Sequence, residues 1–233
     1  MKKILLTVAA VIALSTSAFA EGITFGGSGT VASDVLYRGV SDTNQGAGGI
    51  VDMKVGYDVE VVEVYAGVNA QSTSTNPSMT YSVGAKKDFG LVGLVAEYQF
   101  HDQQDTSNHG GPDNSDSNFE SVLTKVDVDF LGANVFVSGN FVTEENKTRN
   151  LHTEDRYGLG ASYTFKAGVP LTVAVAGYDQ EKWGTNYTAS VDAEVAKNVT
   201  IGVSYNDMNI DTDTQSVLVA DEETVVVSLN YSF

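Results

Sequence analysis

Alternation of apolar and polar side chains, most complete at the end of the chain, limits what this sequence can form. From Thr224 to Phe233 one parity is apolar and the other is polar, with Val226 as the exception. The apolar set is Val225, Val227, Leu229, Tyr231 and Phe233. Because successive side chains of a strand point to opposite faces, this stretch predicts a strand with one apolar and one polar face.

The same alternation recurs along the chain and predicts twelve strands. The weakest is the ninth, where Ala174 and Ala176 blur the polar face. The expected strands cover about 23–39, 48–58, 61–71, 78–88, 91–102, 119–130, 133–143, 156–165, 171–178, 186–195, 199–206 and 224–233.

The connections between these strands alternate in length. Those after the even strands are tight, such as Phe89-Gly90 and Leu131-Gly132, whereas 103–118 and 207–223 are long and polar. Short turns at one end and long loops at the other are typical of outer-membrane barrels, and an even strand count returns both termini to the turn side. Aromatic residues near both strand ends fit the two interfacial belts of such barrels. We therefore expect an all-β fold, a transmembrane antiparallel up-and-down β-barrel of 12 strands.

The first twenty residues have the features of an export signal. Lys2 and Lys3 precede an apolar run, and Ala18-Phe19-Ala20 is a small-residue cleavage site. We expect 1–20 to be a signal peptide and 21–233 a single barrel domain in the cell outer membrane. The chain has no cysteine and a formal charge of -17, which excludes thiol chemistry and gives no basic footprint for nucleic acid.

The segment from Ala32 to Ser41, with its Gly-rich restart at Gly46, resembles the opening of the TorF-type porin family of small outer-membrane proteins. The export signal, the total length and the terminal Phe233 fit the same family. The match departs at Val35, where an aromatic is expected, and at Asp42, where a neutral residue is expected. The resemblance implies a passive channel and brings no particular substrate.

Polar residues at the parity opposite the apolar face should point into the lumen. Acidic groups outnumber basic ones there, which favours cations. The sequence thus predicts a narrow, weakly cation-preferring channel for small hydrophilic solutes or ions. In the alternative, Asp34 pairs with Lys54 and Glu97 with Lys125, and a plugged, non-conducting barrel serves a structural or binding role. The expected pore-lining residues are Asp34, Arg38, Asp52, Lys54, Glu97, Lys125, Arg156 and Asp192.

Catalytic and metal sites are weakly indicated. His101, His109 and His152 fall at or in the expected outer loops, and no spacing singles out a Ser-His nucleophile pair. The acid-rich stretches 102–116 and 207–222 do not follow the ligand spacing of a dedicated Ca²⁺ loop. We therefore expect no enzyme, no metal site and no cofactor, with lipid and small solutes as partners and the oligomeric state left open.

Overall fold

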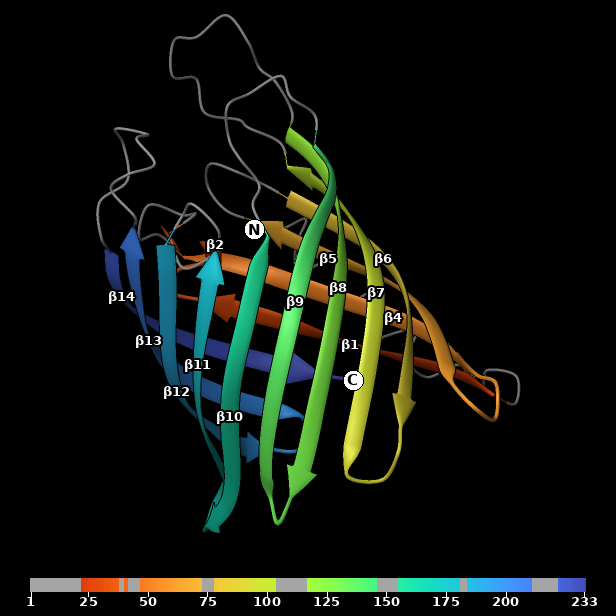
Figure 1. Ribbon diagram of the computed structural model, residues 1–233. Helices are drawn as coiled ribbons and strands as arrows, with labels where there is room; N and C mark the ends of the chain where they lie inside the picture. Colours follow the sequence, from red (N-terminus) through yellow and green to blue (C-terminus); the bar gives the residue numbers. More distant parts are fainter. Residues whose placement is uncertain are drawn as a thin grey trace, which may run out of the picture.

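The computed structural model describes residues 22–37, 40–41, 47–72, 78–103, 117–145, 155–180, 184–210 and 222–233. Twelve antiparallel strands close into one barrel, in which every strand pairs with its neighbours in sequence and β14 pairs with β1 (Figure 1). This confirms the predicted all-β, up-and-down architecture of 12 strands. No helix in the described ranges has the length and apolar character needed to cross a membrane.

The barrel strands follow the predicted ranges closely, and most extend a few residues further towards the long connections. A separate two-stranded hairpin, β2–β3, follows the first barrel strand. The barrel strands are β1 Ile23–Ala32, β4 Gly48–Asp58, β5 Glu63–Ser72, β6 Ser78–Asp88, β7 Val92–Gln103, β8 Ser117–Phe130, β9 Ala133–Glu145, β10 Arg156–Ala167, β11 Val169–Gln180, β12 Gly184–Ala196, β13 Val199–Ile210 and β14 Glu222–Ser232; the hairpin consists of β2 Leu36–Tyr37 and β3 Val40–Ser41.

The connections after β4, β6, β8, β10 and β12 are short and lie at one end of the barrel, here called the turn end; the opposite end is the loop end (Figure 1). The β8–β9 turn has positive φ at both Leu131 (52°) and Gly132 (83°). Positive φ at both central residues defines the two-residue hairpin turn whose twist matches that of the flanking strands. The sequence therefore turns sharply at this end and holds neighbouring strands in register.

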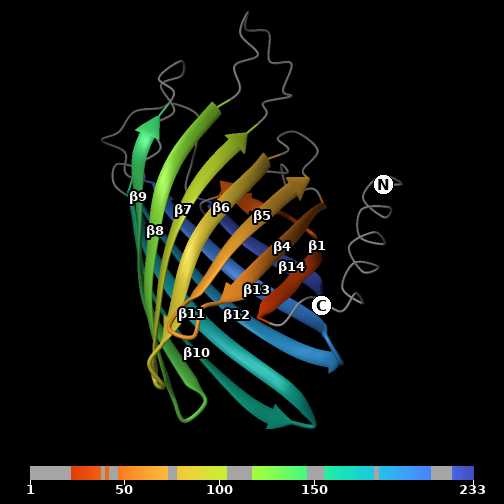
Figure 2. The same cartoon turned by 90° about the vertical axis from the view of Figure 1, so that its right-hand side faces the viewer.

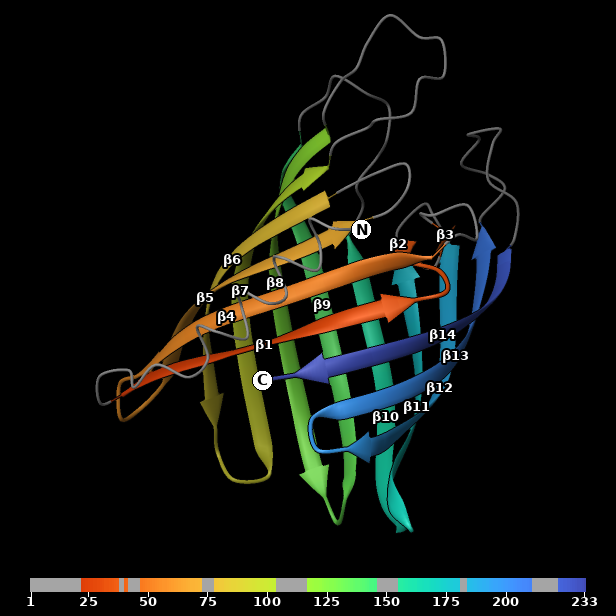
Figure 3. The same cartoon turned by 180° about the vertical axis from the view of Figure 1, so that it is seen from behind.

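The barrel is closed by its first and last strands, which lie side by side in Figure 3. Ser28 to Ala32 pair with Ser228 to Ser232. Gly27 and Phe233 exchange two backbone hydrogen bonds, of 3.1 and 3.0 Å. Because β1 and β14 each find a partner, the sheet has no exposed edge for another strand to join.

The outward face of the barrel is apolar over nearly its whole height. Large aliphatic and aromatic side chains are exposed there, for example Val31 on β1 and Val83 on β6. Aromatic pairs occur near both ends of the strands: Tyr81 and Phe100 lie near the loop end, and Phe25 and Phe233 near the turn end. So continuous an apolar surface is far larger than a water-soluble monomer exposes.

The first strand ends earlier than the sequence predicts, at Ala32 instead of Gly39. Ser33 fastens the departing chain to β14: its backbone N–H donates to the Val227 carbonyl, and its hydroxyl accepts from the Val227 N–H. The next residues then turn into the barrel, where Asp34 and Val35 are only 4% and 2% exposed. A strand over 23–39 would place Val35 on the same outward face as Val31, and this is wrong because the segment leaves the sheet at Ala32 instead of extending it.

Candidate functional site: the barrel interior

The interior of the barrel is lined by the polar set of alternating side chains from each strand. The charged residues among them are unevenly distributed around the barrel. Basic side chains come from β4 to β10, whereas β13, β14 and β1 present mainly Ser, Thr and Asn. Figure 2 shows β4 to β9 side by side in this order. One wall of the interior is thus charged and aromatic, and the other offers neutral hydrogen-bonding groups.

A row of side chains at mid-height joins β4, β5 and β7. The Lys54 Nζ lies 3.2 Å from the centroid of the Tyr65 ring, and the Tyr65 hydroxyl hydrogen-bonds Glu97. Glu97 in turn accepts from Gln99 at 2.6 Å. The Tyr65 ring can lie close to the barrel wall because its neighbour on β6 is Gly84. A Cβ atom at position 84 would come within 2.7 Å of the ring. Two predicted pore-lining residues, Lys54 and Glu97, are therefore connected through a tyrosine.

The row continues towards the loop end through the buried Ser121 and the half-buried His101. The Ser121 hydroxyl donates to Gln99 at 3.3 Å and lies 3.1 Å from His101 Nε2. His101 Nδ1 lies 3.0 Å from the Thr80 hydroxyl, and its ring stacks on Phe119 at 4.0 Å between centroids. A register shift between Glu120 and Ser121 precedes this contact. Such bulges re-aim side chains, which suits the close approach of Ser121 to the histidine.

The remaining predicted residues find separate partners. Asp52 accepts from Asn69 at 3.2 Å, and Asp192 accepts from Ser190 at 3.1 Å. The Arg156 guanidinium lies over the Tyr178 ring at 3.9 Å. Asp34 is buried inside the loop end. Arg38, together with His109 and His152, lies outside the described residues.

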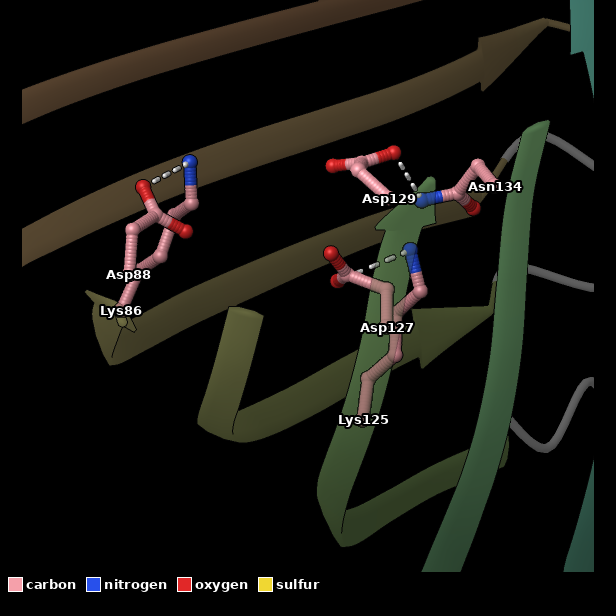
Figure 4. A network of polar contacts seen from close by, with 6 residues as sticks. All are labelled: Lys86, Asp88, Lys125, Asp127, Asp129 and Asn134. Atoms are coloured by element: carbon pink, nitrogen blue, oxygen red, sulfur yellow. Dashed lines mark hydrogen bonds and ion pairs between the residues drawn. The ribbon is translucent and has the colours of Figure 1, made fainter. Parts of the chain in front are cut away.

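Ion pairs occur at the turn end. Lys86 pairs with Asp88 at 3.2 Å and Lys125 with Asp127 at 3.5 Å, and Asn134 donates to Asp129 at 2.8 Å (Figure 4). The pairing considered from the sequence was different. Lys125 pairs with Asp127 rather than Glu97, and Lys54 lies over Tyr65 rather than beside Asp34. Each of the two ion pairs joins two residues of one strand, so neither bridges the lumen.

At the loop end, the segment after β1 encloses a chamber against the wall of β5 to β10. The cavity has a volume of about 220 Å³. Leu36 closes it on one side, and Gln71, Thr80, His101, Phe119, Asn140 and Arg156 line the other. Within the described part of the chain, no cluster of His, Asp and Glu is suited to hold a metal ion.

Several interior residues were not singled out by the sequence analysis. Tyr65, Phe119 and Tyr178 are aromatic residues at the polar parity of their strands, and this mismatch was the available signal. His101 was expected at a solvated rim, but it lies within β7 with both ring nitrogens in contact with hydroxyl groups. The Ser121–His101 contact depends on the β8 bulge, which alternation does not reveal.

Comparisons with known proteins support the fold. No protein-family profile and no curated protein sequence matches this chain, so the resemblance to the TorF-type family stays a prediction. Among solved structures, the KdgM porin aligns with a TM-score of 0.54 at 8% identity, covering 89% of this chain and 99% of that one. An outer membrane channel from Pseudomonas putida F1 aligns at 0.53 and 12%, covering 92% and 96%.

An enzyme has the same architecture. Outer membrane phospholipase A from Escherichia coli aligns with a TM-score of 0.58 at 8% identity, covering 96% of each chain. The prediction from the sequence that this chain is not an enzyme is therefore wrong as an inference from its architecture, because the same fold supports lipid hydrolysis as well as transport. At these identities the likeness establishes the fold alone: this chain is similar to outer-membrane barrels of both kinds.

Proposed function

We propose that this protein is an outer-membrane channel through which ions and small hydrophilic solutes diffuse passively. The observation that carries this function is the contrast between the faces of a closed barrel. Its outer surface is apolar at nearly every outward position, and its interior is polar. The apolar outer face is compatible with the hydrocarbon of a bilayer, and the polar interior is compatible with water and polar solutes.

In this proposal, residues 1–20 direct export and are removed, and 21–233 form the barrel. The interior charges at the predicted positions line the path, and the sequence predicts that Arg38, which lies outside the described residues, joins them. Acidic residues outnumber basic ones among the interior positions, for example Asp52, Glu97, Asp127 and Asp192 against Lys54 and Lys125. An acidic lining concentrates cations, so the channel prefers them weakly.

The path is narrow because side chains fill much of its loop-end half. Barrels of eight strands are filled by side chains, whereas those of sixteen or more leave an aqueous channel, and twelve strands lie between these limits. Here Val35 and Asp34 enter the interior from β1, while Met208 on β13 and Gln180 on β11 are fully buried. We place the constriction at the height of these residues.

Single-channel recording in planar bilayers tests this function. Refolded protein should give small discrete current steps, and its reversal potential across a KCl gradient should show cation preference. Neutralising Glu97 or Asp52 should reduce that preference, whereas neutralising Lys54 or Lys125 should increase it. A clear anion preference would contradict the proposed selectivity.

The alternative function is a barrel with a plugged lumen that binds or supports other components without conducting. The burial of Val35 within the loop-end half favours it. Absence of current from protein with the heat-modifiable mobility of a folded barrel would support this alternative and exclude the channel.

A further inference from the structure

We propose that the loop-end chamber binds one small, neutral, polyhydroxylated molecule about the size of a single sugar ring. The inference rests on the proposed function only in that solutes must reach the lumen. It gives the barrel a binding site in addition to a path. The chamber lies between Leu36 of the inward segment and strands β5 to β10, so its ligand would contact both.

The size of the chamber limits the ligand. Its volume of about 220 Å³ is below the roughly 300–1,000 Å³ typical of pockets for drug-sized molecules. It is also far larger than the space of one water, about 30 Å³. A single ring with its substituents matches this volume, whereas an oligomer does not fit within it.

Two amide groups of the lining need hydrogen-bond partners. Gln71 Oε1 on β5 and Asn140 Oδ1 on β9 are buried and have no partner among the described residues. Buried polar groups are almost always paired, because an unsatisfied one is costly. The Asn140 NH₂ donates to Gln99 at 3.5 Å, so its oxygen needs a donor. The Gln71 amide can present its oxygen or its NH₂ by a half turn, so the partner that suits either orientation both donates and accepts. A hydroxyl group does both.

The lining holds one acid, Asp102, and one base, Arg156, so their charges offset each other, and both have interactions within the protein. His101 uses both ring nitrogens for the hydroxyls of Thr80 and Ser121. The Arg156 guanidinium lies over the Tyr178 ring, where the π-face attracts its charge. The lining therefore offers a ligand the two amide oxygens, together with the apolar surfaces of Leu36 and Phe119, and no net charge. This combination of hydroxyl partners and an apolar surface suits a neutral sugar, which has hydroxyls at its edge and C–H groups on its faces.

Isothermal titration calorimetry of the folded barrel in detergent tests this site, with D-glucose as the probe and D-glucuronate as its anionic counterpart. We expect saturable binding of one glucose per chain. Gln71→Leu and Asn140→Leu remove an amide at nearly constant volume and should each weaken binding at least about tenfold. Asn134→Leu is the matched control, because it makes the same change at the turn end, outside the chamber.

The possible outcomes test the sugar site and the channel separately. No saturable glucose binding by folded protein would overturn the inference, as would an equal loss in Asn134→Leu. Tighter binding of glucuronate than of glucose would also overturn it, because the site would then recognise an anion through Arg156. Glucose binding without current would exclude the channel and support the site, and current without glucose binding would do the reverse.

Discussion

The two halves of the barrel interior differ in packing and in charge. In the loop-end half, Met208 and Gln180 are fully buried and contact each other, with the Gln180 amide 3.8 Å from the Met208 sulfur. In the turn-end half, the Lys86 and Asp88 side chains are 40% and 61% exposed. The loop-end half is packed like a protein core, and the turn-end half is exposed to solvent like a protein surface.

In the proposed channel, this difference separates two tasks. A packed region discriminates by shape and by hydrogen bonding, because a solute must displace or fit between fixed side chains. An open region with net acidic charge acts at longer range and concentrates cations, an effect that salt screens. Size selection should therefore depend on the loop-end half, and ion preference on the turn-end half.

The largest effect should come from removing the inward segment. Replacing Asp34, Val35 and Leu36 with Gly-Ser-Gly leaves the β1–β14 pairing intact, because it ends at Ala32. Single-channel conductance should rise several-fold, since these side chains occupy the packed half. Val35→Leu keeps an apolar side chain of similar size and serves as the control. Unchanged conductance in the folded triple variant would place the constriction elsewhere.

Met208→Ala should destabilise the barrel strongly. The side chain is completely buried inside the loop-end half, so its removal leaves a cavity, and such losses cost about 2–5 kcal/mol. Met79→Ala is the matched control, because Met79 is 38% exposed on the outward face; it should cost roughly 1 kcal/mol. Urea unfolding in lipid vesicles measures both. Equal losses would show that the loop-end half is not packed as a core.

The fold followed from the sequence because alternation with a period of two is local and twelve-fold repeated. The same pattern failed at Val35, whose parity continues that of Val31. An apolar side chain is equally suited to lipid and to a packed interior, so parity alone cannot separate a strand from a segment that turns inward. The hydrogen bonds between Ser33 and Val227, which direct that turn, join residues far apart in the chain.

The charged interior positions could also be read from the sequence, but their partners could not. Lys54 on β4 contacts Tyr65 on the neighbouring β5, and Ser121 contacts His101 next to the register shift in β8. Both contacts depend on how strands are aligned, which single-strand patterns leave undetermined. Aromatic residues at strand positions that otherwise carry polar side chains, such as Phe119, indicate that the interior contains packed aromatic side chains as well as charges.

Ion preference should respond to the turn-end half in a salt-dependent way. Asp127→Asn removes an acid and leaves Lys125 without its ion-pair partner, so cation preference should fall at 0.1 M salt. The change should shrink at 1 M, because the screening length falls from about 10 Å to about 3 Å. Asp179→Asn, an exposed position at the outward parity of β11, is the control. Reversal potentials measure both, and equal shifts would show that the lumen charges are not specific.

The smallest effect should come from the Lys86–Asp88 pair. Both side chains are more than one-third exposed, so water screens their attraction, and such pairs contribute about 0–1 kcal/mol. A double-mutant cycle with Lys86→Gln and Asp88→Asn, followed by urea unfolding, isolates the coupling between them. Removing one member of a buried pair costs much more, about 3–5 kcal/mol, because the other charge is left without a partner and without water. A coupling of that size would mean that the turn-end half is as dry as the loop-end half, and the division between a packed half and a hydrated half would no longer hold.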